Sequence, residues 1–410
     1  MNWKYIIGGI ATFVALIFVV WFIFFRVAST PVTSTTPDGL FGSSQNQPIP
    51  TISNSSAKTQ NQQSFVYTPS RKKIFMIAEG PVTSAVFTQT HNPTTTSVRY
   101  IRQDSGHVFE QPLDTTGSAA RAVSNTTIPG IANAVWTQWG SSVILQYSEG
   151  GTIKTVSVGF QPLATSSALV QLNTPLRFLS DNIVSIAASP DGMNIAYLLQ
   201  TSTGTEGYIA NYNGTNSVRL FSTPLSQLRI TWPSRNKLLL QTKVSAGVPG
   251  MAFSVSVKSG VYTPLLYTSG LSTTVNGNFS SIVYQTDVSG KRTTYEHDVA
   301  SGQDTKLSAQ PIPEKCAWSY VARAVIICAV PNSYVPLNYL DLWHQGALGV
   351  ADTIVGYNFD TEADVAIATP GSKEGGEKSD IGYITVSPNG DYVLYVTRGD
   401  RSLWGVRLTQ

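Results

Sequence analysis

The two cysteines are the residues of this chain whose chemistry depends most on spacing. Cys316 and Cys328 lie 12 positions apart and flank the segment AWSYVARAVII. If that segment is a β-hairpin centred on Ala322, the cysteines lie opposite each other, where β-carbons are about 4.5–5.5 Å apart. A disulfide needs about 3.5–4.5 Å between them. The spacing therefore allows a bridge between Cys316 and Cys328 with a tight fit, and two buried free thiols are the alternative.

Residues suited to metal or catalytic chemistry are scattered rather than grouped. The histidines stand alone, and none lies at metal-ligand spacing from the cysteine pair: His91, His107, His297 and His344. No Gly-x-Ser-x-Gly elbow for a nucleophilic serine is present, and the 24 acidic residues offer no evident acid–base pair. We therefore expect no catalytic residue, no cofactor and no metal, in a protein that is not an enzyme.

A third group combines large aromatic side chains with charge, which is typical of binding hot spots. It occupies a long segment between two apolar runs and consists of Tyr334, Tyr339, Asp341, Trp343 and His344. We interpret this group as a candidate partner-binding loop, because long loops on rigid scaffolds often carry function. The alternative is that the rings pack the segment down onto the rest of the fold.

The elements that would position these residues follow an internal repeat. The turn SPDG at residues 189–192 returns as SPNG at residues 387–390, each time between two apolar, strand-forming runs. In such a turn Pro presets φ, Asp or Asn bonds its own backbone, and Gly takes the left-handed conformation. Similar strand–turn–strand units recur along the chain, each anchored by an apolar or aromatic residue: Phe87, Trp136, Ala188, Trp232, Phe279, Trp318 and Val386.

The spacing of these seven anchors predicts the architecture. Five of the six intervals lie between 39 and 52 residues, close to the period of about 40–50 residues that propeller blades show. A Gly-bearing turn such as Asn213-Gly214 follows most anchors, which gives each unit four antiparallel strands. We therefore predict an all-β, seven-bladed β-propeller of four-stranded antiparallel blades over residues 67–410. A pair of β-sandwich domains is the alternative, and it does not explain the regular intervals.

The last unit lacks a fourth strand, because the sequence stops soon after the apolar run SLWGVRL at residues 402–408. A spare strand-forming run, at residues 74–78, precedes the first anchor. We predict that this run pairs with the final one, completes the last blade and closes the ring, which removes unpaired strand edges.

The interval between Trp318 and Val386 is 68 residues, longer than the other five. We assign the excess to an insertion in the sixth blade at about residues 330–380, which includes the aromatic group described above. Within it, residues 370–380 (PGSKEGGEKSD) are Gly-rich and strongly charged, and we expect them to form a solvated, flexible loop.

The SPDG and SPNG turns after an apolar strand resemble those of the TolB-like and WD-repeat-like propellers of bacterial envelopes. The resemblance covers about residues 70–410 in pattern, but only these two turns match closely. The Gly-His and Trp-Asp dipeptides of eukaryotic WD repeats are absent as a set. The resemblance implies a binding scaffold, often a protein-interaction platform, and it names no partner.

The N-terminal sequence predicts a membrane anchor. Residues 5–25 are an uncharged apolar run between Lys4 and Arg26, long enough as a helix to cross a hydrocarbon core of about 30 Å. A cleaved signal peptide is the alternative, although its apolar region usually spans about 7–15 residues. Residues 1–4 would form a cytoplasmic tip, and residues 26–66, rich in Ser, Thr, Pro and Gln, a flexible stalk.

Together these features predict a single-pass protein of the cell membrane, with its N-terminus in the cytoplasm and its propeller in the periplasm or at the cell surface. The net charge is only +3 and Lys and Arg are scattered, which argues against a nucleic-acid partner. We expect a non-catalytic scaffold that binds a protein or cell-wall ligand. The alternatives are an envelope hydrolase or lyase acting in the propeller funnel, and an accessory or sensor subunit of a membrane complex.

Overall fold

The computed structural model describes residues 72–88, 96–113, 119–124, 126–160 and 176–408. The chain divides into two compact units, Met1–Asn61 and Gln62–Gln410, and every described residue belongs to the second. The predicted cytoplasmic tip, transmembrane helix and stalk (residues 1–66) lie outside the described residues. Within the described part of the chain, no helix combines the length and the apolar composition that a membrane crossing requires.

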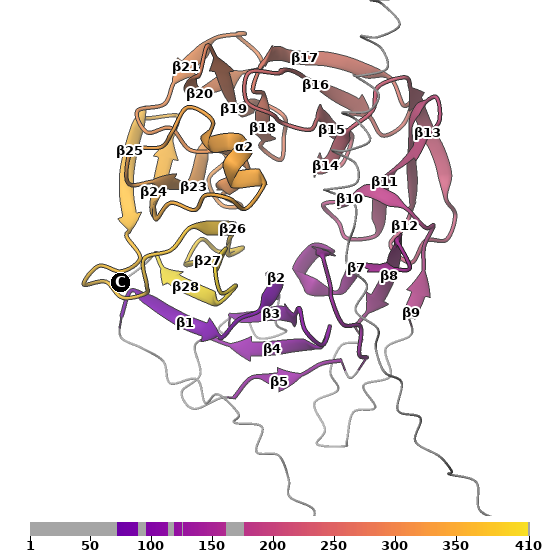
Figure 1. Ribbon diagram of the computed structural model, residues 1–410, viewed down its shortest axis with the longest axis horizontal. Coiled ribbons are helices and arrows are strands. Elements are labelled where there is room, and N and C mark those ends of the chain that lie inside the picture. The colour runs from indigo at the N-terminus through magenta and orange to yellow at the C-terminus, as the bar shows by residue number, and fades with distance from the viewer. Residues whose placement is uncertain (1–71, 89–95, 114–118, 125, 161–175, 409–410) are drawn as a thin grey trace, which may run out of the picture. The chain divides into compact units, whose positions relative to one another are not determined.

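The described residues form seven four-stranded antiparallel sheets, arranged as blades around a central channel (Figure 1). This confirms the predicted all-β propeller, its blade number and its strand count. The first three blades are β2 (Val82–Thr88), β3 (Ser97–Arg102), β4 (Val108–Pro112) and β5 (Arg121–Ala122); β6 (Asn133–Trp136), β7 (Ser142–Glu149), β8 (Thr152–Gly159) and β9 (Leu176–Phe178); β10 (Ile183–Ala188), β11 (Asn194–Thr201), β12 (Gly204–Asn211) and β13 (Val218–Thr223).

The next three blades follow the same order from the channel outward. They are β14 (Leu228–Ser234), β15 (Lys237–Thr242), β16 (Pro249–Ser256) and β17 (Tyr262–Ser269); β18 (Ser272–Val275), β19 (Ser281–Val288), β20 (Lys291–Asp298) and β21 (Asp304–Lys306); β22 (Cys316–Trp318), β23 (Val325–Pro331), β24 (Asp352–Asn358) and β25 (Ala363–Ala368). Two short 3-10 helices, η1 (Gln138–Gly140) and η2 (Pro313–Lys315), lie in the connections.

The seventh blade combines both ends of the described chain. It orders β1 (Ile74–Ala78), β28 (Leu403–Arg407), β27 (Tyr392–Thr397) and β26 (Ile381–Val386) from the rim to the channel. Ile74 pairs with Val406 and Phe75 with Gly405 in antiparallel register. The predicted clasp between residues 74–78 and the final apolar run is therefore confirmed.

The two duplicated turns adopt the same local structure in blades three and seven. Asn194 donates its backbone N–H to Ser189 Oγ at 2.9 Å, and Tyr392 does the same to Ser387 Oγ at 2.9 Å. The Gly of each turn has a left-handed φ, 72° at Gly192 and 78° in the second turn, where a side chain would be strained. Each turn therefore links the two innermost strands of its blade, β10 to β11 and β26 to β27.

The hydrophobic core lies between neighbouring blades. In one cluster Phe87 and Val98 of blade one pack with Leu394 and Leu403 of blade seven, and none of the four is more than 2% exposed. A single blade has apolar side chains on both faces, because side chains alternate along a strand. Each blade is therefore stable only between two neighbours, which is why the clasp in blade seven matters for the whole ring.

The predicted insertion is two separate segments. Residues 332–351 connect β23 to β24 within blade six and contain the short helix α2 (Tyr339–His344). Residues 369–380 connect blade six to blade seven, and several of them are exposed, as expected of a solvated loop, although the segment also contacts the clasp strand. Ile74 donates its backbone N–H to Glu374 O at 3.0 Å, and Lys73 Nζ lies 3.4 Å from Glu374 Oε1. Residues 369–380 therefore pack against the clasp strand.

Candidate functional site: an aromatic funnel and a buried charge cluster

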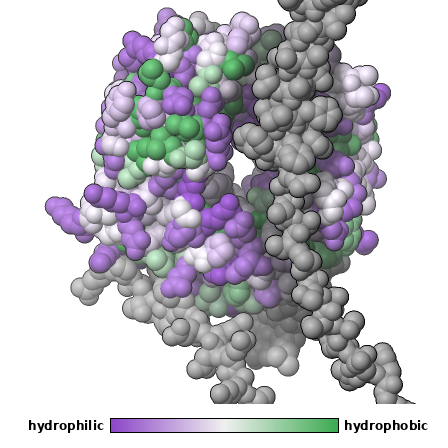
Figure 2. Space-filling view, in the orientation of Figure 1, coloured by the Kyte–Doolittle hydropathy of each residue, from purple (hydrophilic) through white to green (hydrophobic). Residues whose placement is uncertain are grey.

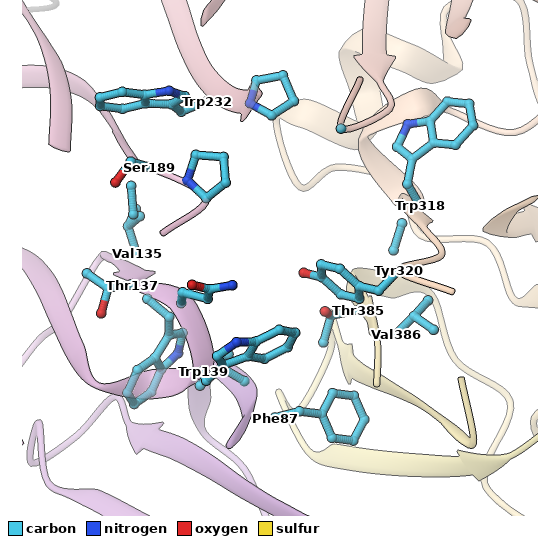
Figure 3. Close-up of a pocket in the computed structure, with 18 of the residues that line it drawn as sticks. Phe87, Val135, Thr137, Trp139, Ser189, Trp232, Trp318, Tyr320, Thr385 and Val386 are labelled. Atoms are coloured by element: carbon cyan, nitrogen blue, oxygen red, sulfur yellow. The ribbon is translucent and has the colours of Figure 1, made fainter. Parts of the chain in front are cut away.

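A cavity of about 700 Å³ occupies the end of the channel where the innermost strands of all seven blades terminate. Six of the seven sequence anchors line it: Phe87, Trp136, Ala188, Trp232, Trp318 and Val386. Figure 3 labels four of them, Phe87, Trp232, Trp318 and Val386. The seventh, Phe279, is 4% exposed and packs in the core, while its neighbours Gly277 and Asn278 take the lining position. The repeat found in the sequence therefore marks the rim of this funnel.

Two aromatic rings meet in the middle of the funnel. Trp139, from η1 of blade two, and Tyr320, from the loop after β22 in blade six, have ring centroids 5.3 Å apart (Figure 3). Trp139 has φ 55° and ψ 25°, a left-handed conformation that is costly for a bulky side chain. Such strain persists only where the surrounding structure enforces it, and it often marks a functional position.

Most polar side chains of the lining are already bonded within their own turns. Ser142 donates its backbone N–H to Thr137 Oγ1 at 2.8 Å, and Ser280 donates to Asn276 Oδ1 at 2.9 Å. Ser189 Oγ is bonded in the SPDG turn, where it donates to Asp191 Oδ1 at 2.6 Å. These hydroxyl and amide groups hold the turns in shape, so few of them are available to a ligand.

The lining has almost no ionisable groups. Among its described residues Arg323 is the single charged side chain, and no Asp, Glu or His takes part. Burial raises the pKa of the Tyr383 hydroxyl to about 12, and this hydroxyl donates to Ala85 O at 3.2 Å. General acid–base catalysis at neutral pH needs a group with a pKa near 7, and the raised pKa of Tyr383 lies far from that value.

The structure separates the five residues of the predicted partner loop. Tyr339 and Trp343 are 1% and 5% exposed and belong to a core cluster with Leu340 and Ile312. The ring-packing alternative therefore describes these two residues. Tyr334, by contrast, is 87% exposed. Hydrophobic residues gather over α2 and blade six in Figure 2.

The two polar members of that loop contact neighbouring segments of the fold. Asp341 Oδ1 accepts a hydrogen bond from the backbone N–H of Ala246 at 2.9 Å. His344 is exposed and its Nε2 lies 3.6 Å from Glu314 Oε1. Asp341 thus fixes the start of α2 to blade four, whereas His344 lies at the surface.

Beneath α2 lies a buried charge cluster that the sequence analysis missed. Lys315 Nζ is 2.6 Å from both Asp352 Oδ2 and Asp380 Oδ1, and Lys315 and Asp352 have no exposed side-chain surface. Trp343 Nε1 donates to Asp380 Oδ2 at 3.0 Å, and the guanidinium of Arg398 lies 4.3 Å from the Trp343 ring centroid. Burial raises the pKa of Asp352 to about 6, against the opposing attraction of Lys315.

The funnel and the insertion lie on opposite faces of the ring. β22 ends at the funnel, and β23 is antiparallel to it. β23 therefore begins at the funnel and ends at the other face, where residues 332–351 follow. The two candidate sites cannot share one small ligand.

Cys316 and Cys328 occupy directly opposite positions on β22 and β23, as the hairpin register required. Their sulfur atoms are bonded at 2.08 Å. No three His, Cys, Asp or Glu side chains come together as a metal site in the described part of the chain.

No family model and no curated protein matches the sequence. The β-propeller domain of Cps50 (Swd1) from Myceliophteria thermophila is 13% identical, with 82% of this chain and 100% of that chain covered and a TM-score of 0.52. An oligogalacturonate lyase in complex with manganese is 10% identical, with 82% and 99% covered and a TM-score of 0.51. These likenesses concern the fold.

TolB from Acinetobacter baumannii is 13% identical, with 64% of this chain covered and a TM-score of 0.43, and the chain spans 59% of that TolB. The predicted likeness to known propellers is confirmed at the level of the fold, by the seven four-stranded blades and by the β-propeller domain of Cps50.

Proposed function

We propose that this propeller is a non-catalytic binding scaffold, anchored to the membrane of the cell envelope, whose funnel receives a protein or cell-wall ligand. The observation that carries the proposal is the lining of the funnel. All seven blades contribute to it, seven of its 26 residues are aromatic, and its described residues include one charged group and no Asp, Glu or His. Concave, mostly apolar sites with few polar groups are typical of binding pockets.

The anchor and the location rest on sequence and on the disulfide. The apolar run at residues 5–25 has the length of a membrane-spanning helix. Disulfides persist in oxidising compartments, and the bond between Cys316 and Cys328 favours a propeller outside the cytoplasm. We expect the full chain to stay with membranes after alkaline extraction, and protease added to intact spheroplasts to cut the propeller. Release of the chain by alkali, or protection of the propeller, would contradict the anchor or the orientation.

Site-specific photocrosslinking in native membranes tests the funnel as the binding site. A photoreactive amino acid replaces Gln138, an exposed residue of the funnel lining, or Val218, which is 66% exposed on the outer strand β13. We expect a discrete adduct from position 138, none from position 218, and loss of the adduct when Trp139→Gly is added. An adduct from position 218 without one from position 138 would place the binding surface elsewhere.

The alternative of an envelope hydrolase or lyase lacks a supporting feature in the described funnel, because no carboxylate or imidazole lines it. The likeness to the lyase is one of fold, at 10% identity, and fold alone does not carry an activity. An accessory subunit of a membrane complex is a special case of the scaffold, and the same crosslinking would identify its neighbour.

A further inference from the structure

Arg323 lines the funnel with a side chain that does not help to hold the fold together. It lies in the same loop as Tyr320, between β22 and β23 of blade six, and is exposed. Its guanidinium forms no ion pair or hydrogen bond with any residue that the structure describes, and it is the one charge among the described lining residues. A lone cation beside low-dielectric walls attracts anions and orients them.

The kind of anion follows from the groups around Arg323. A guanidinium matches a carboxylate through two parallel hydrogen bonds. A phosphate carries more charge and usually requires several cations or a set of backbone N–H donors, and no second cation lines the described funnel. The site therefore suits a single carboxylate.

The neighbouring rings define the rest of the ligand. Tyr320 is 61% exposed although its ring lies against Trp139 in the middle of the funnel. Rings that remain exposed in a concave site offer stacking surface to an apolar or aromatic side chain. Trp139 holds its ring against Tyr320 from a left-handed backbone conformation, which fixes the place of the ring in the funnel.

The small number of unbonded polar groups in the funnel favours a peptide ligand over a sugar ligand. Recognition of a glycan needs many oriented donors and acceptors, because each ring presents several hydroxyls that lose water on binding. Here Thr137, Ser189 and Asn276 are already bonded within their turns. The side chains of Gln138, Tyr320 and Arg323, which form no hydrogen bond that the described residues account for, are too few for a polyhydroxylated ligand and sufficient for a carboxylate beside an apolar group.

We propose that the funnel binds a protein segment in which a carboxylate stands next to an apolar or aromatic side chain, with the carboxylate paired to Arg323 and the apolar side chain stacked on Trp139 and Tyr320. This inference rests on the proposed binding function and specifies its ligand class. The pairing fixes the orientation of the segment, and the stacking supplies buried apolar area.

Selection from a randomised peptide library, with the full-length protein in detergent as bait, tests the ligand class. We expect Asp or Glu next to an aromatic or aliphatic residue in the retained peptides. A retained peptide should bind about tenfold more tightly than its Asn or Gln counterpart, since a charge-assisted pair is worth roughly a factor of ten. Arg323→Gln should remove that ratio, and Arg177→Gln, an exposed arginine on the outer strand β9, should preserve it.

The outcomes separate the ligand class from the binding function. Equal affinity for the acidic peptide and its amide counterpart, or an equal effect of Arg323→Gln and Arg177→Gln, overturns the ligand class. Binding of a neutral chito-oligosaccharide that Trp139→Gly abolishes, with no peptide retained, also overturns it. In each of these cases an adduct at position 138 still supports the proposed scaffold, whereas the absence of that adduct counts against the scaffold itself.

Discussion

Lys315 and Asp352, two side chains with no exposed surface, pair at 2.6 Å between Nζ and Oδ2 beneath the insertion helix. Asp380 shares the same ammonium group, so two carboxylates meet one lysine. One of the buried oxygens, Asp352 Oδ1, has no hydrogen-bond partner among the described residues. The contacts of this buried carboxylate therefore offset only part of the free-energy cost of burying its charge. The stability of the cluster is sensitive to protonation for that reason.

We predict that Asp352 makes the protein less stable as pH rises from about 4 to about 6. Its folded-state pKa is raised to about 6, above the unfolded value of about 3.9, so the folded protein binds the proton more tightly in this window. The free energy of unfolding should therefore fall relative to that of Asp352→Asn by up to about 3 kcal/mol. Urea unfolding of both proteins across this pH range measures the difference, with Asp364→Asn on the exposed strand β25 as a control. A difference that stays flat or grows with pH would refute the prediction.

Within residues 332–351, the effect of a mutation on stability should depend on whether the side chain is buried in the core or exposed at the surface. Trp343→Ala removes a ring that is 5% exposed and should cost about 3–5 kcal/mol of unfolding free energy. Tyr334→Ala, at a side chain that is 87% exposed, should change it by less than about 0.5 kcal/mol. Chemical denaturation compares them. Similar losses for both variants would mean that Tyr334 packs against the fold.

Replacement of Trp139 should distinguish backbone strain from side-chain function. At φ 55°, Gly avoids a clash that Ala keeps, so Trp139→Gly should be more stable than Trp139→Ala by about 1 kcal/mol. At Val218 in strand β13 the order should reverse. Both Trp139 variants should lose funnel binding. Thermal unfolding gives the stabilities, and an alanine variant at position 139 that equals the glycine variant would contradict the strain.

Buried side chains of the clasp strand β1 should contribute strongly to the free energy of unfolding of the ring. Ile77 in β1 is 1% exposed, and Ile153 in β8 is 37% exposed. Ile77→Ala should cost about 2–5 kcal/mol, whereas Ile153→Ala should stay within about 0.5 kcal/mol. Unfolding monitored by near-ultraviolet circular dichroism compares the two. Equal, small effects would show that the ring persists without a tightly packed β1.

The disulfide should contribute measurably because it closes a loop between residues 12 positions apart. Reduction should lower the free energy of unfolding by about 2–3 kcal/mol, according to the chain-entropy model. The double variant Cys316→Ser/Cys328→Ser should no longer respond to reductant. Non-reducing mass spectrometry of freshly isolated protein is the direct check, and two free thiols there would refute both the bond and its oxidising location.

The sequence predicted the ring because its signals are local and repeated. The SPDG and SPNG turns, the anchors from Phe87 to Val386 and the terminal strand at residues 74–78 each follow from turn chemistry or alternation within a few residues. The anchors also marked the funnel rim, since an innermost strand must end where the channel opens. Phe279 departs from this pattern, because its turn directs the ring into the core.

The charge cluster and the strained tryptophan could not be predicted in the same way. Lys315 meets carboxylates 37 and 65 positions away, and no local pattern indicates such a pairing before the blades are assembled. Tyr339 and Trp343 illustrate a second limit, because large aromatics suit a core and a binding hot spot equally. Trp139 shows a third, since its left-handed φ follows from the packing around η1 rather than from its residue type.

The outermost strand of blade seven, β1, has a single neighbour in its sheet, β28. The ribosome makes β1 before any other described strand and β28 after all of them. During translation β1 therefore has no strand to pair with until the other six blades have been synthesised. Every prematurely terminated product retains an unpaired strand edge. Such products are exposed to proteases and to aggregation, and blade seven gains its fourth strand only after β28 has been synthesised.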